Sequence, residues 1–475
     1  MRSMRWMWML LLVVPGLGAA GCRSTGGADG AITAPASAPP SPDRETVLAE
    51  TTLWRTHFTD PDLNRLVDAA IGGNNDLKAA VQRIVSARAV VTGARGALLP
   101  AVNAVAGSSL QRFGEYTMDG AGNKGVPIYG DQNIPLNLPN FLVGVQAAWE
   151  MDIWGRLRSQ KAAAVARFLA NEEGRRLVLT GLVGDVAGIY YDILALDSTL
   201  RILDQNIHLQ EEAFEAVRAQ REAGLADALA VDQFEARLQN LRGLFLESGE
   251  ARLDLEAALR ILVGDAGLQI PSPAEAVLLR KPLPRLSLEV PGSLLAQRSD
   301  VRRAENELVA ARADLRAARA AFYPAVNITG AVGFEAFRAD LVPNPQSIAY
   351  NLAAGLAAPL VNRAAIRAAF QQAGAAELEA LANYQQSIVN AFVEVRNHQA
   401  KVGLLEDLFG VKTREVELRA RSVETSGDLF ASRRATYLDV LIARQTALDS
   451  ELELLQIRNR QFQLQIGLYR ALGGG

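Results

Sequence analysis

The stretch DLKAAVQRIVSARAVVTGARGALLPAVN, from Asp76 to Asn103, returns later in the chain as DVRRAENELVAARADLRAARAAFYPAVN, from Asp300 to Asn327. The two segments align without a gap, and 13 of their 28 positions are identical. Amino-acid composition alone would give roughly three identities. The chain of 475 residues is therefore a tandem duplication, and each copy is expected to fold in the same way. We call this alignment, which pairs Asp76 with Asp300, the first register.

A second register, with a slightly shorter constant offset, carries the duplication toward the C-terminus. It pairs Arg158 with Arg367, Val186 with Val395, Leu229 with Leu438, Val231 with Val440, Leu259 with Leu468 and Gly264 with Gly473. We therefore expect a first repeat over residues 45–265 and a second repeat over residues 293–475. The Pro-rich stretch between them, residues 266–292, is expected to be a linker.

The first residues carry the signals of export. Arg2 and Arg5 precede a short apolar run, and small residues then lead to Cys22, the single cysteine of the chain. Because the apolar run is too short to span a bilayer, residues 1–21 are predicted to be a secretory signal peptide. Cys22 has no partner for an internal disulfide and stands where a bacterial lipobox places its lipidated cysteine. The alternative is an ordinary signal peptide with an incidental cysteine.

Residues 22–44 are rich in proline and alanine and are expected to form a flexible tether behind the lipidated cysteine. Arg23 follows Cys22 where an aspartate would favour retention at the inner membrane, so the outer membrane is the expected location. After residue 22 no stretch approaches 18 consecutive apolar residues, and the sequence predicts no transmembrane helix there.

Long helices dominate the expected secondary structure. No proline interrupts the chain from about Gly155 to Arg221, and apolar residues recur there at alternating spacings of four and three. This heptad pattern favours coiled-coil-like packing. The stretch around Gly224 is expected to reverse the chain into an antiparallel partner helix. A second ascending helix is expected from about Ala364 to Glu424, with a descending partner after it.

Four shorter segments alternate between apolar residues and small or polar residues, which is the period of a β-strand. They lie near residues 101–112, 141–150, 326–336 and 348–358. Each has about the ten residues of a transmembrane β-strand. A soluble β-hairpin in each repeat is the alternative, and the exported, lipidated character of the chain favours barrel strands.

Four strands cannot close a barrel, because bacterial barrels begin at about eight strands. An open sheet edge in lipid would leave backbone groups unpaired. Two chains would supply eight strands and a filled interior, whereas three chains would supply twelve strands and room for a pore. The expected fold class is therefore mainly α with a β-barrel portion. Two tandem repeats of long coiled-coil-like helices and four strands per chain would form a shared 12-stranded barrel and a helical tunnel in a trimer.

Composition and motifs argue against several other classes. The formal net charge is −3 and no basic patch carries interleaved aromatics, so nucleic-acid binding is not predicted. His57, His208 and His398 stand apart from other metal ligands, so neither a metal nor another cofactor is expected. The sequence has no nucleophile–base motif, which disfavours an enzyme such as a periplasmic hydrolase and predicts no catalytic residues. A coiled-coil scaffold without a pore is a third class, and the four strands argue against it.

Several stretches resemble the TolC-like outer-membrane factor family, in its OprM-like lipoprotein branch. They are the segment that begins at Trp54, WEMDIWGRLR from Trp149 to Arg158, and VPGSLLAQRSDVRRAENELVAARADLRAARAAFYPAVNITG from Val290 to Gly330. Two positions depart from the family pattern: Ser299 stands where proline is usual, and Ala364 stands where glycine is expected. Both substitutions are compatible with the start of a helix.

The resemblance implies the outer-membrane channel of a tripartite efflux system, which gives small molecules passive passage to the outside. The channel would be a homotrimer in outer-membrane lipid that extends into the periplasm. Its partners would be a periplasmic adaptor and an inner-membrane pump of the RND type. The linker, residues 266–292, would join the N-terminal segment and the C-terminus in an equatorial belt. The exit duct of a type I protein secretion system is the alternative.

The resemblance also implies a periplasmic gate where the helical hairpins end, with hairpin tips at Gly224 and Gly427. Asp439 matches the pore-facing acid of the family, and a threefold axis would turn it into a ring of three like charges that favours cations. The alternative for Asp439 is that it caps or solvates the start of a helix.

Two other gate positions differ from the family. The second acid of the family is replaced by Ile442, and its arginine would fall at Ala435, with Arg433 and Arg434 beside it. A rewired latch that uses Arg433 and Arg434 is therefore expected.

We predict that Cys22 becomes the lipidated N-terminus of the mature chain, because it follows a signal peptide and has no partner cysteine. Metabolic labelling with a palmitate analogue should mark the parent protein and leave Cys22→Ser unlabelled. Label retained in the variant would contradict this. Channel assembly should survive the substitution if the barrel supplies the main anchor.

Overall fold

The computed structural model describes residues 54–123, 127–129, 132–134, 137–224, 226–270, 278–284, 297–358 and 363–474. These residues belong to one compact unit, Thr52–Gly475. The expected signal peptide, Cys22, the tether and much of the expected linker lie outside the described residues.

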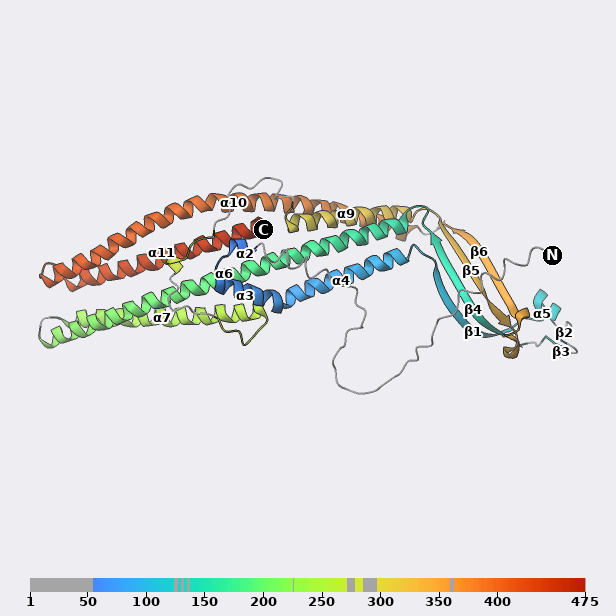
Figure 1. Cartoon of the computed structure of the whole chain (residues 1–475), viewed down its shortest axis with the longest axis horizontal. Coiled ribbons are helices and arrows are strands. Elements are labelled where there is room, and N and C mark those ends of the chain that lie inside the picture. The colour runs from blue at the N-terminus through green and yellow to red at the C-terminus, as the bar shows by residue number, and fades with distance from the viewer. Residues whose placement is uncertain are drawn as a thin grey trace. The chain divides into compact units, whose positions relative to one another are not determined.

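Long helices make up most of the described chain, and strands occupy one end of them (Figure 1). The helices are α2 (Trp54–His57), α3 (Pro61–Gly73), α4 (Asn75–Gly96), α5 (Met118–Asn123), α6 (Arg156–Glu222), α7 (Ala228–Val263), α9 (Ser299–Ala320), α10 (Ala364–Ala431) and α11 (Tyr437–Ala471). Short 3-10 turns are η1 (Leu278–Arg280), η2 (Ala339–Leu341) and η3 (Pro345–Ser347). The strands are β1 (Ala101–Arg112), β2 (Pro127–Tyr129), β3 (Gln132–Asn133), β4 (Asn137–Met151), β5 (Ala325–Ala336) and β6 (Ile348–Ala357). The mainly helical class and the four long strands expected from the sequence are confirmed.

Two antiparallel hairpins account for the longest helices. Helix α6 packs against α7, and α10 packs against α11, while α9 lies against both α6 and α10 (Figure 1). Helices α6 and α10 have 67 and 68 residues, so each is roughly 100 Å long at 1.5 Å per residue. Such lengths follow from sequences without internal proline, whose apolar residues form a seam along each helix.

The main core lies where the N-terminal segment, α6 and α11 meet. The ring of Tyr191 stacks on Phe462 with centroids 4.2 Å apart, and Phe58 meets Tyr469 edge-on at 5.3 Å. One stretch of α6 is long and apolar enough to cross a membrane by length and composition, but 61% of it is buried in the fold. We therefore interpret this stretch as a core helix segment.

Strands β1, β4, β5 and β6 form one antiparallel sheet in the order β1-β4-β5-β6. The register places alternate residues of neighbouring strands on the same face. Val145 lies opposite Val332, which lies opposite Tyr350. The exposed apolar residues of this face are Val102, Leu110, Val143, Val145, Val332, Phe334, Ile348, Tyr350, Leu352 and Leu356.

The opposite face of the same sheet is built mainly from small and polar residues, although Val105, Leu138 and Leu142 also lie on it. It carries Asn103, Gln146, Asn327, Thr329 and Asn351. The sheet is therefore apolar on one side and polar on the other, and its apolar side is exposed in the single chain.

Glycines allow β4 and β5 to approach closely at the centre of the sheet. Gly144 and Gly333 lie directly opposite each other in the strand pairing. A Cβ atom on Gly144 would lie 2.6 Å from the carbonyl oxygen of Val332, and one on Gly333 would lie 2.5 Å from that of Val143. Neither position has room for a side chain.

The duplication is visible in the backbone at positions that the second register pairs. Asp227 caps the N-terminus of α7, and Thr436 caps that of α11. Gly264 follows α7 with φ of 74°, and Gly473 follows α11 with φ of 91°. A left-handed residue at these helix ends favours glycine because a side chain would be strained there.

Candidate functional site at the hairpin ends and the N-terminal clasp

The first hairpin reverses between α6 and α7. Gly224 lies in this turn with φ of 72°, a conformation that glycine adopts without strain. The side chain of Asp227 then accepts a hydrogen bond of 2.8 Å from the backbone N–H of Ala230. A left-handed glycine followed by an aspartate cap is therefore the local reason for the reversal.

The second hairpin reverses between α10 and α11 through an equivalent turn in which arginine replaces glycine. Arg433 corresponds to Gly224 in the second register. It has φ of 57° and is the one non-glycine residue with positive φ among those described. Its successor Arg434 donates its backbone N–H to Leu429 at 2.8 Å, and Arg433 donates to Phe430 at 2.9 Å. These two bonds form a Schellman motif. The left-handed arginine costs about 1–2 kcal/mol.

Gly427 does not make this turn, which corrects its assignment to the hairpin tip. It lies inside α10, which continues to Ala431 instead of ending near Glu424. A glycine in a helix interior costs about 1 kcal/mol relative to alanine, which is too little to end a long packed helix. The reversal instead requires a left-handed residue, and that residue is Arg433.

Asp439 belongs to a capping box at the start of α11. Its carboxylate accepts hydrogen bonds from the backbone N–H of Thr436 at 2.8 Å and from the Thr436 hydroxyl at 2.7 Å. The backbone N–H of Asp439 donates in turn to the Thr436 hydroxyl oxygen at 3.3 Å. In the single chain Asp439 therefore caps a helix, as the alternative interpretation expected. The motif Thr-x-x-Asp before an apolar run was the sequence signal for it.

The capping bonds keep Asp439 charged. Hydrogen bonds from Thr436 lower the pKa of the Asp439 carboxyl below its ordinary value of 3.8. Because the folded-state pKa is lowered, this contribution to stability is present above the ordinary pKa and is lost as the pH falls through the lowered one. The side chain is also exposed. Asp439 can therefore cap the helix and still present a negative charge to solvent.

The two hairpin ends contact each other through apolar side chains. Phe234 of α7 lies 6.2 Å from the ring of Tyr437 on α11, and Leu441 packs against the same small cluster. Sequence reasoning missed this contact, because the two residues lie in different repeats. Arg433 and Arg434 are exposed, and their side chains bond to no residue in the described part of the chain. The structure therefore leaves both arginines beside the hairpin end without bringing them to Asp439.

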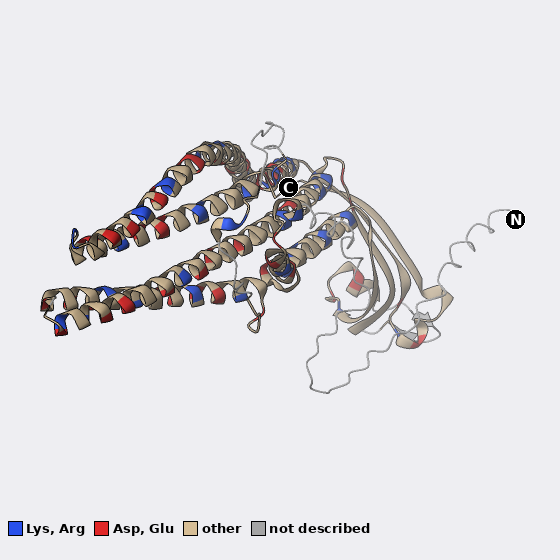
Figure 2. Cartoon of the chain, turned by 60° about the vertical axis from the view of Figure 1, so that its left-hand side comes forward, with Lys and Arg blue, Asp and Glu red and all other residues tan. Residues whose placement is uncertain are grey.

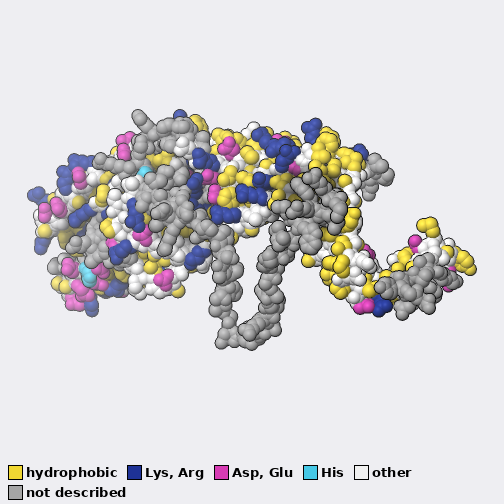
Figure 3. Space-filling view, turned by 45° about the vertical axis from the view of Figure 1, so that its right-hand side comes forward, with side chains coloured by type: hydrophobic (Ala, Val, Ile, Leu, Met, Phe, Trp, Pro, Cys, Tyr) yellow, Lys and Arg dark blue, Asp and Glu magenta, His cyan; other side chains and the backbone are white. Residues whose placement is uncertain are grey.

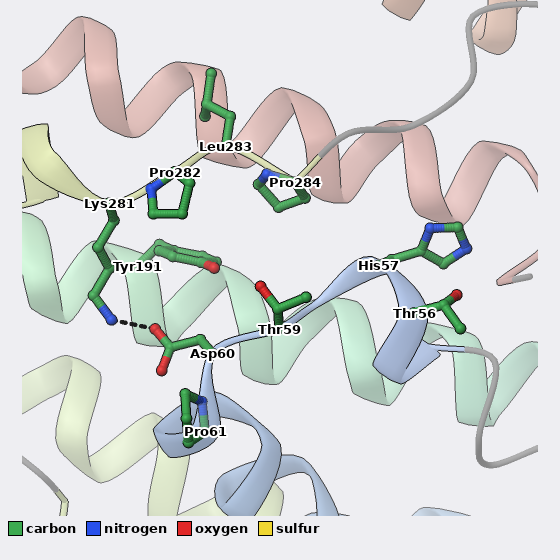
Figure 4. Close-up of a pocket in the computed structure, with 10 residues that line it drawn as sticks. All are labelled: Thr56, His57, Thr59, Asp60, Pro61, Tyr191, Lys281, Pro282, Leu283 and Pro284. Carbon is green, nitrogen blue, oxygen red and sulfur yellow. Dashed lines mark hydrogen bonds and ion pairs between the residues drawn. The ribbon is translucent and has the colours of Figure 1, made fainter.

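A cavity of about 490 Å³ lies between the N-terminal segment, α6 and the segment after η1 (Figure 4). It is lined by Thr56, His57, Thr59, Asp60, Pro61, Tyr191, Lys281, Pro282, Leu283 and Pro284. The side chains of Asp60 and Lys281 point toward each other at one side of it. The cavity is thus bounded by segments that are far apart in the sequence.

Asp60, Tyr190, Lys281 and Arg458 form a connected group that we call the clasp. Lys281 pairs with the carboxylate of Asp60, which also accepts a hydrogen bond of 2.9 Å from the hydroxyl of Tyr190. The backbone carbonyl of Lys281 accepts a bond of 2.5 Å from Arg458. Asp60 and Lys281 are largely buried, with side-chain exposures of 9% and 22%. The clasp therefore joins the N-terminal segment, α6, the η1 segment and α11.

Two of the three histidines, His57 and His398, make contacts inside the fold, whereas His208 is exposed. His57 lies edge-on to Tyr469, with centroids 5.7 Å apart, and burial lowers its pKa below 6.5. As the pH falls below 6.5, protonation of His57 therefore favours the unfolded chain, which takes up the proton more readily than the folded chain does. The ring Nδ1 of His398 lies 2.8 Å from the carbonyl of Glu394. Within the described residues no group of three or more His, Cys, Asp or Glu side chains could hold a metal ion.

Two long helical hairpins attached to a sheet with one apolar and one polar face are the features of an outer-membrane channel subunit. The model of the outer membrane efflux protein family matches residues 66–265 and 290–474. The chain therefore belongs to the outer membrane efflux protein family.

Two relatives and one solved structure are similar to this chain over most of its length. The pyoverdine export outer membrane protein OpmQ of Pseudomonas aeruginosa is 30% identical, over 89% of this chain and 87% of its own length. The solvent efflux pump outer membrane protein SrpC of Pseudomonas putida is 28% identical, over 91% of this chain and 89% of its own. Crystallised CusC, described in terms of transmembrane channel formation, superposes with a TM-score of 0.78 at 25% identity, over 89% of this chain and 94% of that chain.

The clasp yields a stability prediction. Asp60→Asn would leave the charge of Lys281 largely buried without its partner, and we expect it to lower the free energy of unfolding by about 3 kcal/mol. The matched control is Asp68→Asn, because Asp68 pairs with Arg55 where both side chains are half exposed. The exposed Asp68–Arg55 pair should contribute less than about 1 kcal/mol to the free energy of unfolding. Denaturant unfolding followed by circular dichroism measures both, and equal losses would refute the special role of the clasp.

Proposed function

We propose that this chain is the outer-membrane channel of a tripartite efflux system and gives small molecules passive passage to the outside. Membership of the outer membrane efflux protein family supports the outer-membrane location and the efflux role. The names of OpmQ and SrpC, which refer to pyoverdine export and solvent efflux, favour small molecules over a type I protein secretion duct. In this role the protein is a channel and not an enzyme.

The observation that carries the proposal is the two-faced sheet. Its apolar face is exposed in the single chain, with Tyr350 and Leu352 at 83% and 80% exposure. An apolar face of this kind suits lipid, and the polar face suits an aqueous lumen. Among the described residues, β1 and β6 each pair on one side only. Three chains that pair these edges would form a closed 12-stranded barrel, and this homotrimer satisfies the backbone in lipid.

The remaining parts of the chain take places around this barrel. The signal peptide (residues 1–21) is removed, and Cys22 with the tether (residues 22–44) anchors the trimer to outer-membrane lipid. The long helices of the two repeats, residues 45–265 and 293–475, form a coiled-coil-like tunnel through the periplasm. Residues 266–292 contribute to an equatorial belt, to which the clasp also belongs. No cofactor takes part.

The hairpin ends are proposed to face the partners of the channel. The partners are a periplasmic adaptor and an inner-membrane pump, which we place in the RND class by the resemblance of the sequence. The second hairpin end supplies the gate, with Asp439 as the pore-facing charge and Arg433 and Arg434 as the rewired latch. The first hairpin end has Ala230 where the second has Asp439, so it takes the outer, adaptor-facing place.

The barrel proposal predicts an effect that depends on the face of the sheet. Val143→Arg would place a charge on the apolar face and should cost about 2–4 kcal/mol near the bilayer midplane. Gln146→Arg is the control, because Gln146 lies on the opposite, polar face of the same strand. The measurement is unfolding in lipid vesicles together with cross-linking. Equal costs on both faces, or cross-linking that stops at dimers, would refute the trimeric barrel.

The gate proposal separates the charge of Asp439 from its capping role. Asp439→Asn should reduce cation selectivity in planar bilayers, because it removes a ring of three negative charges. Thr436→Ala weakens the same cap, at a cost of about 1 kcal/mol, and should leave selectivity unchanged. Small residues at Arg433 and Arg434 should raise the closed-state current. Unchanged selectivity and unchanged current in these gate variants would place the gate elsewhere.

A further inference from the structure

The four places where a long helix meets the sheet lie at the same end of it. They connect α4 to β1, β4 to α6, α9 to β5, and β6 to α10. The strand pairing aligns them, because Ala101 pairs with Ala148, Met151 with Val326, and Ala325 with Ala357. We call this level of the molecule the junction.

At every one of these four connections, an arginine lies in the terminal turn of the helix that enters or leaves the sheet. Arg95 and Arg319 are in the last turns of α4 and α9 and are equivalent in the first register. Arg158 and Arg367 are in the first turns of α6 and α10 and are equivalent in the second register. All four side chains are exposed. Both copies of the duplicated unit therefore present the same pair of cations to the same level.

The junction is basic although the chain is acidic. Residues 93–100, 150–161, 313–324 and 358–367 contain eight basic and three acidic side chains, a net charge of +5 in a chain of net charge −3. The strands beyond them carry charges only near their ends, at Arg112, Glu150 and Glu335. In Figure 2 the sheet is almost free of colour, whereas the helices beside it are marked in blue. Figure 3 shows basic side chains gathered next to the hydrophobic surface at this end.

Interactions within the chain account for only part of this pattern. Arg95 and Arg319 follow the helix dipole, which favours cations at a C-terminus, but Arg158 and Arg367 oppose it at an N-terminus. Arg158 is compensated by an ion pair with Asp152. Neither Arg95, Arg319 nor Arg367 has a side-chain partner in the described part of the chain. Each of the three exposed guanidinium groups is therefore available to an external anion.

Aromatic side chains mark the same level. Trp154 stacks on Tyr323 with ring centroids 4.8 Å apart, and both are about half exposed, at 50% and 47%. The indole N–H of Trp154 donates to the carbonyl of Pro324 at 2.8 Å. Exposed tryptophan and tyrosine rings beside apolar surface are typical of the headgroup layer of a membrane. The junction therefore combines the two residue types that meet lipid headgroups.

We infer that the junction is a binding site for the phosphate headgroups of anionic phospholipid in the periplasmic leaflet, held by Arg95, Arg319 and Arg367 at the level of the Trp154–Tyr323 stack. This inference rests on the proposed placement of the sheet in the outer membrane. The planar guanidinium group of arginine matches the oxygens of a phosphate with two parallel hydrogen bonds. In a trimer the three positions would form a ring of nine cations around the channel.

The test uses the tryptophans of the junction as reporters. The protein is reconstituted in phosphatidylcholine vesicles that contain an equal mole fraction of either brominated phosphatidylglycerol or brominated phosphatidylcholine. Bromine quenches the fluorescence of nearby tryptophan. The difference in quenching between the parent protein and Trp154→Phe gives the signal of Trp154 at the junction. We expect stronger quenching by phosphatidylglycerol, and high salt should weaken the preference.

The variant Arg95→Gln/Arg319→Gln/Arg367→Gln should lose roughly fivefold in relative phosphatidylglycerol affinity for each arginine removed. The matched control is Arg83→Gln/Lys401→Gln/Arg421→Gln, which removes three exposed cations away from the junction and should keep the preference. Lysine at the three junction positions should restore part of the preference, because lysine keeps the positive charge but cannot form the two parallel hydrogen bonds.

The outcomes distinguish this inference from the proposed function. Equal quenching by the two lipids, or an equal loss in the control variant, would overturn the headgroup site and leave the channel intact. Absence of quenching by either lipid would show that the sheet does not enter the bilayer, which would overturn both.

Discussion

The pairing of backbone groups at the edges of the four-stranded sheet is the constraint on which the rest of the structure depends. A sheet with one exposed apolar face is unfavourable in water, and a sheet with open edges is unfavourable in lipid. In the proposed channel, several chains would pair their β1 and β6 edges, and lipid would cover the apolar face. The helices that enter and leave the sheet would then follow the same symmetry, so the proposed barrel would extend into a tube of helices.

The proposed tube would need a fixed relation between the two hairpins of each chain, and the clasp supplies part of it. Asp60 forms an ion pair with Lys281 and accepts a hydrogen bond from Tyr190, and the backbone carbonyl of Lys281 accepts a hydrogen bond from Arg458. Arg458 also lies over the ring of Phe462, 5.4 Å from its centroid. Buried ionic contacts of this kind add little net stability, but they are costly to leave half-paired. They therefore favour one arrangement of the four segments over alternatives.

Duplication explains both the regularity and the asymmetry of the chain. The two hairpins share caps and left-handed turn positions at a constant offset, so their backbones reverse in the same way. The side chains at the two ends differ: Gly224 corresponds to Arg433, and Ala230 corresponds to Asp439. At these two positions the first end has uncharged residues and an unstrained glycine, whereas the second end has two charged residues, one of them a left-handed arginine. Backbone strain of this kind persists where the surrounding structure enforces it, and it often accompanies function.

The sequence by itself determined the helices, the four long strands and their two faces, because these depend on local periodicity. The heptad spacing predicted α6, the duplication predicted α10 as its counterpart, and the alternation around Val143 and Tyr350 predicted β4 and β6. The family resemblance also placed Asp439 at the hairpin end. The Thr-x-x-Asp capping box that joins Asp439 to Thr436 was also readable from the sequence, but it was not recognised there. These features need only neighbours along the chain.

Only the tertiary structure decided which segments meet. Asp60 binds Tyr190 across 130 residues and Lys281 across 221 residues, and no local pattern specifies such pairs. The same holds for the contact of Phe234 with Tyr437. The turn at Arg433 was hidden because arginine rarely adopts a left-handed conformation, so a nearby glycine, Gly427, was the more probable choice from sequence. The Schellman hydrogen bonds of the folded hairpin hold Arg433 there, and they exist only once α10 has run its full length.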